Sequence, residues 1–298
     1  GQTCVPRQRA QAGVPPHRAL IHHSRQSCSV ANRASKRAGM SNAATGNAVL
    51  EFDRLPDGRL VASGRFRTGG NGTGGGLGNQ GAVTLTRSEK WLLAVNAGSD
   101  SVSVLEVRRR GLRLAGVEGS GGTRPVSVTE YRGLVFVLNA GSDSITGFKL
   151  GRNGELWPIS GSTRQLSTTG TAPAQISFSP DGDLLVVTEK ATDRIVTFEV
   201  DRDGMPGQAR VQSSNGATPF GFAFGKRDRL FVSEAFGGMP NVSATSSYEV
   251  DRNGVLSTIS ASERPWWRTD AVRLEKSWTA PMRTTPNAIH KSDGSQPQ

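Results

Sequence analysis

Leu184-Leu-Val-Val-Thr-Glu189 is followed by the polar segment Lys190-Ala-Thr-Asp-Arg194 and then by Ile195-Val-Thr-Phe-Glu-Val200. The first and last segments are short and rich in β-branched residues, which predicts a buried strand, a turn and a half-buried partner strand. Equivalent first segments occur three more times: Trp91-Leu-Leu-Ala-Val-Asn96, Leu134-Val-Phe-Val-Leu-Asn139 and Arg229-Leu-Phe-Val-Ser-Glu234. This self-similarity predicts an architecture built from one repeated unit.

The repeats begin at equivalent positions with a regular spacing. Gln80, Pro125, Pro173 and Pro219 lie 45, 48 and 46 residues apart, and each introduces a predicted first strand. Later in each repeat a glycine-containing turn precedes a fourth strand, because glycine tolerates the positive φ of tight hairpins. Four short strands in about 45 residues are typical of one blade of a β-propeller.

The sequence therefore predicts an all-β fold, a β-propeller of four-stranded blades that spans residues 40–262. Residues 47–65 have the pattern of only two strands joined by Pro56-Asp-Gly58, so about four and a half blades are expected. Residues 1–39 and 263–298 show no strand or helix periodicity, which predicts a basic unstructured tail and an irregular C-terminal tail. The change at Glu263 is abrupt, and a shifted reading frame in the coding DNA is one explanation.

The net charge of +11 lies mostly outside the repeats. Residues 1–39 contain seven Lys or Arg and no Asp or Glu, whereas residues 40–262 contain 23 basic and 21 acidic residues. A nearly neutral repeat region argues against a nucleic-acid-binding surface. No apolar run approaches the ~18 residues of a membrane span, and no secretory signal is visible, so the compartment is left open.

No cofactor and no metal ion is expected from the motifs. Cys4, Cys28 and three histidines lie in the N-terminal tail at spacings that match no standard zinc site. The glycine-rich segment 69–81 contains Gly-x-Gly-x-x-Gly twice, but a predicted strand follows it instead of the helix that a dinucleotide site requires. We interpret it as a flexible connection between repeats.

Several phrases of the repeats resemble the lactonase-type seven-bladed β-propellers, which include 6-phosphogluconolactonase and carboxymuconate cyclase relatives. The residues that carry the resemblance are Gly122-Thr-Arg-Pro-Val-Ser127, Thr171-Ala-Pro-Ala-Gln-Ile-Ser-Phe-Ser-Pro-Asp-Gly182, Ala217-Thr-Pro-Phe-Gly-Phe-Ala-Phe224 and Phe231-Val-Ser-Glu-Ala-Phe236. The resemblance implies a small-molecule lactone as the ligand. Seven blades would need about 315 residues of repeat, so the ring is expected to be open.

An open ring predicts consequences for behaviour in solution. The terminal blades are expected to expose apolar side chains such as Val232 and Phe222, and to associate with other chains through their open edges. We also expect the chain to be largely inactive, because an open channel holds a substrate on one side only.

Six residues form the predicted site. Asn96, Asn139, Glu189 and Glu234 each end a second strand, so they are expected at one rim of the propeller. Arg124 and Gln175 flank the anchor prolines at the channel mouth. Arg124 would hold a substrate anion bidentately, and Glu189 or Glu234 would activate a water molecule as general base. The simpler interpretation is that these strand-end side chains cap nearby backbone amides.

Two functions therefore remain open. The first is hydrolysis or cyclisation of a lactone of a carboxylated or phosphorylated sugar acid, or of a related small molecule. The second is a non-catalytic interaction propeller or an inactive, truncated family member. The second function is favoured by a missing residue type. The family's proposed chemistry uses a histidine, and residues 40–262 contain none.

Overall fold

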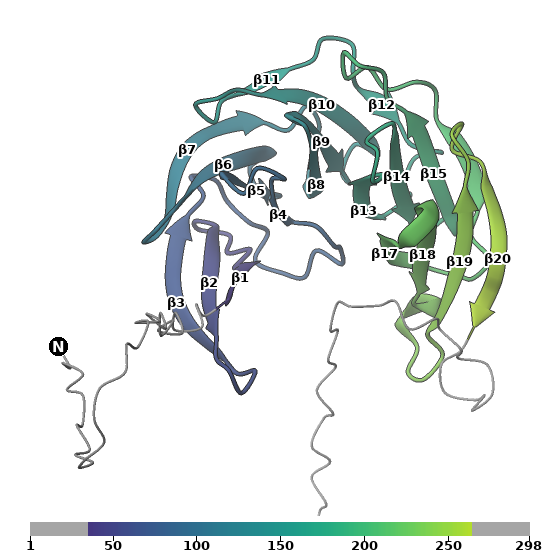
Figure 1. The fold of residues 1–298 in the computed structure, drawn as a ribbon, viewed down its shortest axis with the longest axis horizontal. Helices are drawn as coiled ribbons and strands as arrows, with labels where there is room; N and C mark the ends of the chain where they lie inside the picture. Colours follow the sequence, from purple (N-terminus) through teal and green to yellow (C-terminus); the bar gives the residue numbers. More distant parts are fainter. Residues whose placement is uncertain (1–34, 264–298) are drawn as a thin grey trace, which may run out of the picture.

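The computed structural model describes residues 35–263, and in this part of the chain five antiparallel sheets stand side by side around a central space. The arrangement is an open ring, with a gap between the first and the last sheet (Figure 1). Two 3-10 helices, η1 (Lys226–Asp228) and η2 (Phe236–Gly238), are the helical elements of these residues. None of the described helices is long and apolar enough to cross a membrane. The predicted all-β propeller of four-stranded blades is confirmed.

Four sheets are complete blades, named here blades A to D. In each blade the innermost strand comes first in the sequence and the strands follow in order toward the outside. Blade A contains β4 (Val83–Leu85), β5 (Trp91–Asn96), β6 (Ser101–Arg108) and β7 (Gly111–Gly119). Blade B contains β8 (Pro125–Tyr131), β9 (Leu134–Asn139), β10 (Ser144–Leu150), β11 (Leu156–Pro158) and β12 (Arg164–Gln165). Blade C contains β13 (Pro173–Phe178), β14 (Leu184–Glu189), β15 (Arg194–Glu199) and β16 (Arg210–Ser213). Blade D contains β17 (Pro219–Phe224), β18 (Arg229–Glu234), β19 (Ala244–Val250) and β20 (Leu256–Glu263).

The fifth sheet, here called the N-terminal sheet, begins at Ser35, whereas the sequence predicted that the propeller starts at residue 40. It has three strands, β1 (Ser35–Met40), β2 (Ala48–Arg54) and β3 (Leu60–Arg67), where two were expected. β1 pairs with β2 over six residues, and Lys36 Nζ lies 2.6 Å from Glu51 Oε1. Its own sequence gives little strand signal, so pairing with β2 defines it. The rest of the predicted tails, 1–34 and 264–298, lies outside the described residues.

The core lies between the blades. All six residues of β14 are buried, because blade B covers one face of blade C and blade D covers the other. Phe136 and Leu138 of blade B pack in one cluster with Ile176 and Leu185 of blade C. Each fully buried large apolar side chain contributes about 1.5–3 kcal/mol to folding. A single blade therefore depends on its neighbours for stability.

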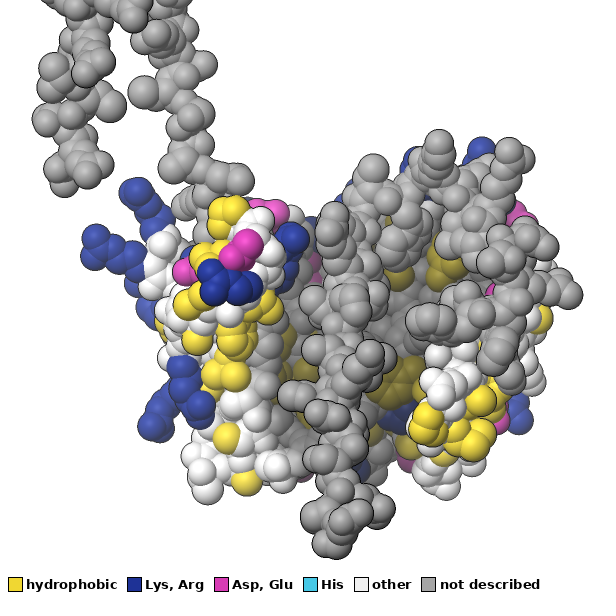
Figure 2. All heavy atoms as spheres, turned by 90° about the horizontal axis from the view of Figure 1, so that it is seen from below, with side chains coloured by type: hydrophobic (Ala, Val, Ile, Leu, Met, Phe, Trp, Pro, Cys, Tyr) yellow, Lys and Arg dark blue, Asp and Glu magenta, His cyan; other side chains and the backbone are white. Residues whose placement is uncertain are grey.

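Blade D shows what happens where a neighbour is missing. Along β18, Leu230 and Val232 are buried against blade C, whereas Phe231 is only partly buried and Ser233 is exposed. The expected exposure of Val232 and Phe222 is wrong, because both side chains face blade C. The open face carries Phe231 instead. Hydrophobic side chains are visible at both ends of the open ring, on the N-terminal sheet and on blade D (Figure 2).

We predict that the open faces make the chain self-associate. Light scattering after size-exclusion chromatography should give a mass above 31.6 kDa that rises with protein concentration. The Phe231→Lys variant should weaken this association about 10-fold, because it places a charge on the open face. Met239→Lys is the matched control, since Met239 is 61% exposed and lies outside the strands of blade D. A mass of 31.6 kDa at every concentration would contradict the prediction.

Candidate functional site

The four predicted strand-end residues occupy equivalent positions, as expected. Asn96, Asn139, Glu189 and Glu234 are the last residues of β5, β9, β14 and β18. Their exposed fractions are only 0%, 0%, 0% and 1%. These four side chains are therefore not exposed to solvent in the central space. Their hydrogen-bond partners account for this burial.

The two carboxyl groups bind protein hydroxyl and amide groups: Glu189 those of the connection into blade C and of its own β14–β15 turn, and Glu234 those of the outer strands of blade D. Glu189 accepts hydrogen bonds from the amide of Ser167 at 2.9 Å, from the hydroxyl of Ser167 and from Thr192 Oγ1 at 2.6 Å. Glu234 accepts from Ser246 Oγ at 2.5 Å and from Ser262 Oγ at 2.7 Å. Both carboxyl groups are thus engaged by protein donors. One of these five bonds, from Ser167, has a backbone amide as donor and the other four have hydroxyl donors, so the partners are mainly side chains and the general-base role stays a prediction.

The two asparagines also bind protein groups. Asn96 Oδ1 accepts from Asn47 Nδ2 at 3.0 Å and from Thr68 Oγ1 at 2.7 Å, while its Nδ2 donates to Ser103 Oγ at 2.7 Å. This buried network joins the N-terminal sheet to blade A. Asn139 Nδ2 donates to the carbonyl of Ser120 at 3.1 Å, within the segment that leads into blade B. Asn139 Oδ1 is buried without a hydrogen-bond partner among residues 35–263, so only the Asn96 amide is satisfied on both of its atoms.

We predict that Glu189→Ala lowers the free energy of unfolding by about 2 kcal/mol, because three half-buried donors of Ser167 and Thr192 lose their buried acceptor. Urea unfolding measures this change. Glu199→Ala is the control, since Glu199 is exposed on the adjacent strand β15 and should change stability by less than about 0.5 kcal/mol. If Glu189→Gln unfolds like the wild type but loses turnover of a lactone about 100-fold, Glu189 is catalytic and the structural assignment is wrong.

The residues before the anchor prolines share an uncommon backbone conformation. Arg124, Ala172 and Thr218 have φ angles of 51°, 47° and 57°. The preceding blade holds these segments: Asp100 accepts from the amide of Arg124 at 2.6 Å, and Asp193 accepts from that of Thr218 at 2.6 Å. In blade C the equivalent bonds run from Gly170 and Thr171 to Asp143. Positive φ is costly for a residue with a side chain, so these bonds fix the entry to each inner strand.

Two long cationic side chains stand at rim positions where the other blades have small residues. Arg124 takes the place of Ala172 and Thr218 before the proline. Lys190 follows the second strand of blade C, at the position of Ala97, Ala140 and Ala235 in the other blades. Sequence reasoning identified Arg124 but missed Lys190. The sequence did contain a signal for Lys190, because the other three repeats have alanine at the equivalent position.

The side chain of Lys190 is partly removed from water, and its charge interacts with the charge of Arg124. Its Nζ donates to the carbonyl of Gly78 and lies 5.3 Å from the centre of the Phe220 ring. Burial, and secondly the charge of Arg124, lower the pKa of Lys190 below its ordinary value of 10.5. Within residues 35–263 neither cation forms an ion pair with a carboxylate. Two neighbouring cations without an acidic partner are a ready site for an anion.

The glycine-rich segment 69–81 reaches the inner strands beside these cations. Ten positions separate Gly70 from Gln80, whereas three separate Gly122 from Pro125 in the next connection. The longer loop extends from β3 into the centre of the ring (Figure 1), and the amide of Gln80 donates to the carbonyl of Ala174 at 2.9 Å. Because the loop also binds Lys190 through Gly78, it is a fixed part of the rim and not the flexible connection that we expected.

Gln175 lies at the inner strands, as predicted, and bridges two of them. Its Nε2 donates to the carbonyl of Phe222 at 3.0 Å, and its Oε1 accepts from the amide of the same residue at 2.9 Å. A Cβ atom on Gly221 would lie 3.1 Å from Gln80 Cγ and 3.6 Å from Gln175 Oε1. The inner strands of blades C and D thus meet the glycine-rich loop at this point. In residues 35–263 no three His, Cys, Asp or Glu side chains lie close enough together to hold a metal ion.

Radial, four-stranded antiparallel blades define a β-propeller. The chain belongs to the family described as "Lactonase, 7-bladed beta-propeller", whose model matches residues 82–261. A search of curated proteins finds no match.

Solved structures share the fold at low sequence identity. A candidate 6-phosphogluconolactonase of Bacteroides fragilis has a TM-score of 0.60 at 19% identity, with 79% of this chain and 69% of that chain covered. A candidate 6-phosphogluconolactonase of Bacteroides uniformis has a TM-score of 0.60 at 17% identity, with 79% and 70% covered. The periplasmic gluconolactonase PpgL of Pseudomonas aeruginosa has a TM-score of 0.56 at 18% identity, with 73% and 64% covered. The chain thus spans about two thirds of the length of these proteins.

Proposed function

We propose that this protein is a lactonase-type propeller that acts on the lactone of a sugar acid or a related acid carrying a carboxylate or phosphate group. The observation that supports the proposal is the pair Arg124 and Lys190, two cations at the inner rim whose charges interact and which have no carboxylate partner among residues 35–263. Membership of the lactonase family supports the reaction class. The similar proteins from Bacteroides and Pseudomonas are described as lactonases of sugar acids, and they support a sugar-acid lactone as the substrate by analogy.

The rim cations suit two steps of lactone hydrolysis. The exposed guanidinium of Arg124 can bind the acid group of the substrate through two parallel hydrogen bonds. Lys190 can then stabilise the negative charge that forms on the carbonyl oxygen when water attacks. The ring C–O bond breaks, the leaving oxygen takes a proton and the hydroxy acid is released. The same contacts would hold the hydroxy acid for the reverse cyclisation.

Alanine substitutions test this site without disturbing the fold. The Arg124→Ala and Lys190→Ala variants each restore the residue that equivalent positions carry, at Ala172 and at Ala140. Each variant should lower kcat/KM for 6-phosphogluconolactone about 10- to 100-fold, because this is the usual effect of losing one charge-assisted hydrogen bond. Turnover of unphosphorylated gluconolactone should fall less with Arg124→Ala.

Arg202→Ala is the control for these assays, because Arg202 is exposed in the turn between β15 and β16. It should leave both activities within about 2-fold of the wild type. Unchanged kinetics in both rim variants would contradict the assignment of the site.

The lowered pKa of Lys190 predicts a pH dependence of anion binding. Lys190 loses its positive charge as the pH rises through a pKa below 10.5, so affinity for 6-phosphogluconate should fall at alkaline pH, and the fall should begin at a lower pH than for an ordinary lysine. The phosphate is fully ionised over this range, because its second pKa is about 6. Calorimetric titration should show the fall in the wild type and a flatter profile in Lys190→Arg. Equal profiles in the two proteins would contradict this role of Lys190.

A non-catalytic binding role is the second candidate. It is favoured by Glu189 and Glu234, whose carboxyl groups are buried and bound to protein hydroxyls, and by the absence of histidine from residues 40–262. Tight, Arg124-dependent binding of 6-phosphogluconate without turnover of any lactone would favour this role.

A further inference from the structure

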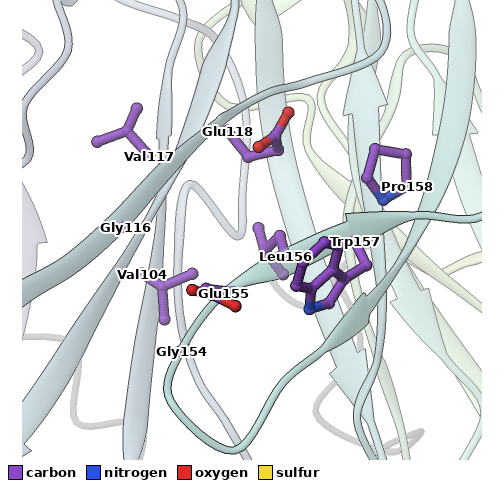
Figure 3. A pocket seen from close by; sticks show the side chains of 9 residues that line it. All are labelled: Val104, Gly116, Val117, Glu118, Gly154, Glu155, Leu156, Trp157 and Pro158. Atoms are coloured by element: carbon purple, nitrogen blue, oxygen red, sulfur yellow. The ribbon is translucent and has the colours of Figure 1, made fainter.

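A groove of about 410 Å³ lies between the outer strands of blades A and B, on the outside of the ring (Figure 3). The strands β7 and β11 that form its walls are the outermost of their sheets, so the groove is separate from the inner rim. Nine residues line it: Val104, Gly116, Val117, Glu118, Gly154, Glu155, Leu156, Trp157 and Pro158.

The groove exists because the outer strand of blade B is interrupted. β11 has three residues and β12 has two, whereas β7 has nine and β20 has eight. On the other wall, β7 bulges at Ala115, where its register with β6 shifts between Val104 and Leu105. Bulges redirect the side chains that follow them. Gly116 and Gly154 line the groove, and Gly154 packs so closely on Trp91 and Ala115 of blade A that a Cβ atom there would lie 2.7 Å from the Trp91 ring.

The side chains of the groove combine an apolar wall with free acidic groups. Trp157 is 59% exposed and Val117 is 42% exposed. Figure 3 shows Leu156 between Glu155 and Trp157, with Glu118 and Pro158 above them. In residues 35–263 the carboxyl groups of Glu118 and Glu155 have no ion pair.

The lack of ion pairs is notable because basic residues are abundant in this chain. On the neighbouring strands, Glu106 lies 2.8 Å from Arg113 and 2.9 Å from Arg108. A scattered exposed apolar or acidic residue needs no explanation. Here a large aromatic ring, an apolar wall and two unpaired acids share one concave surface.

An arginine side chain matches this chemistry. Its planar guanidinium stacks on a tryptophan ring and pairs with carboxylates, while its methylene groups pack on apolar surface. Pro158 has no amide hydrogen, so strand addition along β11 is disfavoured and side chains must carry the recognition. We propose that the groove binds an extended basic segment of a partner protein, in which an arginine stands next to an apolar residue.

The test is calorimetric titration of the full chain with the hexapeptide acetyl-GVRVRG-amide and with the same peptide carrying citrulline in place of both arginines. The arginine peptide should bind at least about 10-fold more tightly than the citrulline peptide, because citrulline keeps the shape and loses the charge. Its affinity should fall about 10-fold in Trp157→Ala and about 10-fold in the double variant Glu118→Gln/Glu155→Gln. Raising the salt concentration should weaken binding of the arginine peptide only.

Two exposed residues away from the groove serve as controls. Met239→Ala removes another exposed apolar side chain, and Glu249→Gln removes another exposed acid, on β19. Both variants should bind the arginine peptide within about 2-fold of the wild type. Equal affinity for the two peptides, or an equal loss in Glu249→Gln, would overturn the proposal. Loss of self-association in Trp157→Ala, with no peptide binding by the wild type, would assign the groove to a second copy of the chain and would also overturn it.

Discussion

Contact between the faces of neighbouring blades is the interaction on which the rest of this structure depends. A blade is a small sheet with apolar side chains on both faces, and β14 is buried along its whole length only because blades B and D lie on either side. The removal of this surface from water supplies most of the stabilisation, and it cannot be obtained within one blade. The open faces of the terminal sheets follow directly from the same constraint. β18, which has a neighbour on one side only, alternates between buried and accessible residues.

Polar contacts between blades fix the orientation that apolar packing leaves free. The turn aspartates Asp100, Asp143 and Asp193 each bind backbone amides at the start of the next blade. A hydrogen bond to a carboxylate is directional, whereas apolar contact is not, so the same contact repeated three times sets one angle between successive blades. In blades B and D the aspartate binds the amide of the positive-φ residue before the proline, whereas in blade C it binds the two residues before Ala172. Arg124 owes its place at the rim to this device.

Most of the fold could be predicted from the sequence, because every blade repeats the same local signals. Alternation, hairpin glycines and the anchor prolines are all properties of short segments, and the strands lie where these signals predict them. β1 was missed because its order comes from pairing with β2, which no local signal records. The geometry of the candidate site was harder to predict from the sequence for a related reason. Equivalent strand positions placed Glu189 and Glu234 at strand ends, but their orientation is decided by Ser167 in the connection between blades B and C and by Ser246 and Ser262 on the outer strands of blade D. The partner of Lys190, Gly78, lies 112 residues away in the chain.

The repeats also provide an internal comparison that a non-repetitive fold lacks. At each equivalent position the blades face nearly the same structural demands, so a residue that departs from the others has a cause outside the shared scaffold. Asn96 and Asn139 differ from Glu189 and Glu234, yet all four form hydrogen bonds to protein groups at a strand end, so that difference stays within structural chemistry. Arg124 and Lys190 depart in another way, because each replaces a small residue by a long cation and neither has an acidic partner in residues 35–263. A protein that needed only to fold would have no reason to bring two cations together. Their juxtaposition, more than the buried carboxyl groups, is therefore where the chemistry of this propeller is expected to lie.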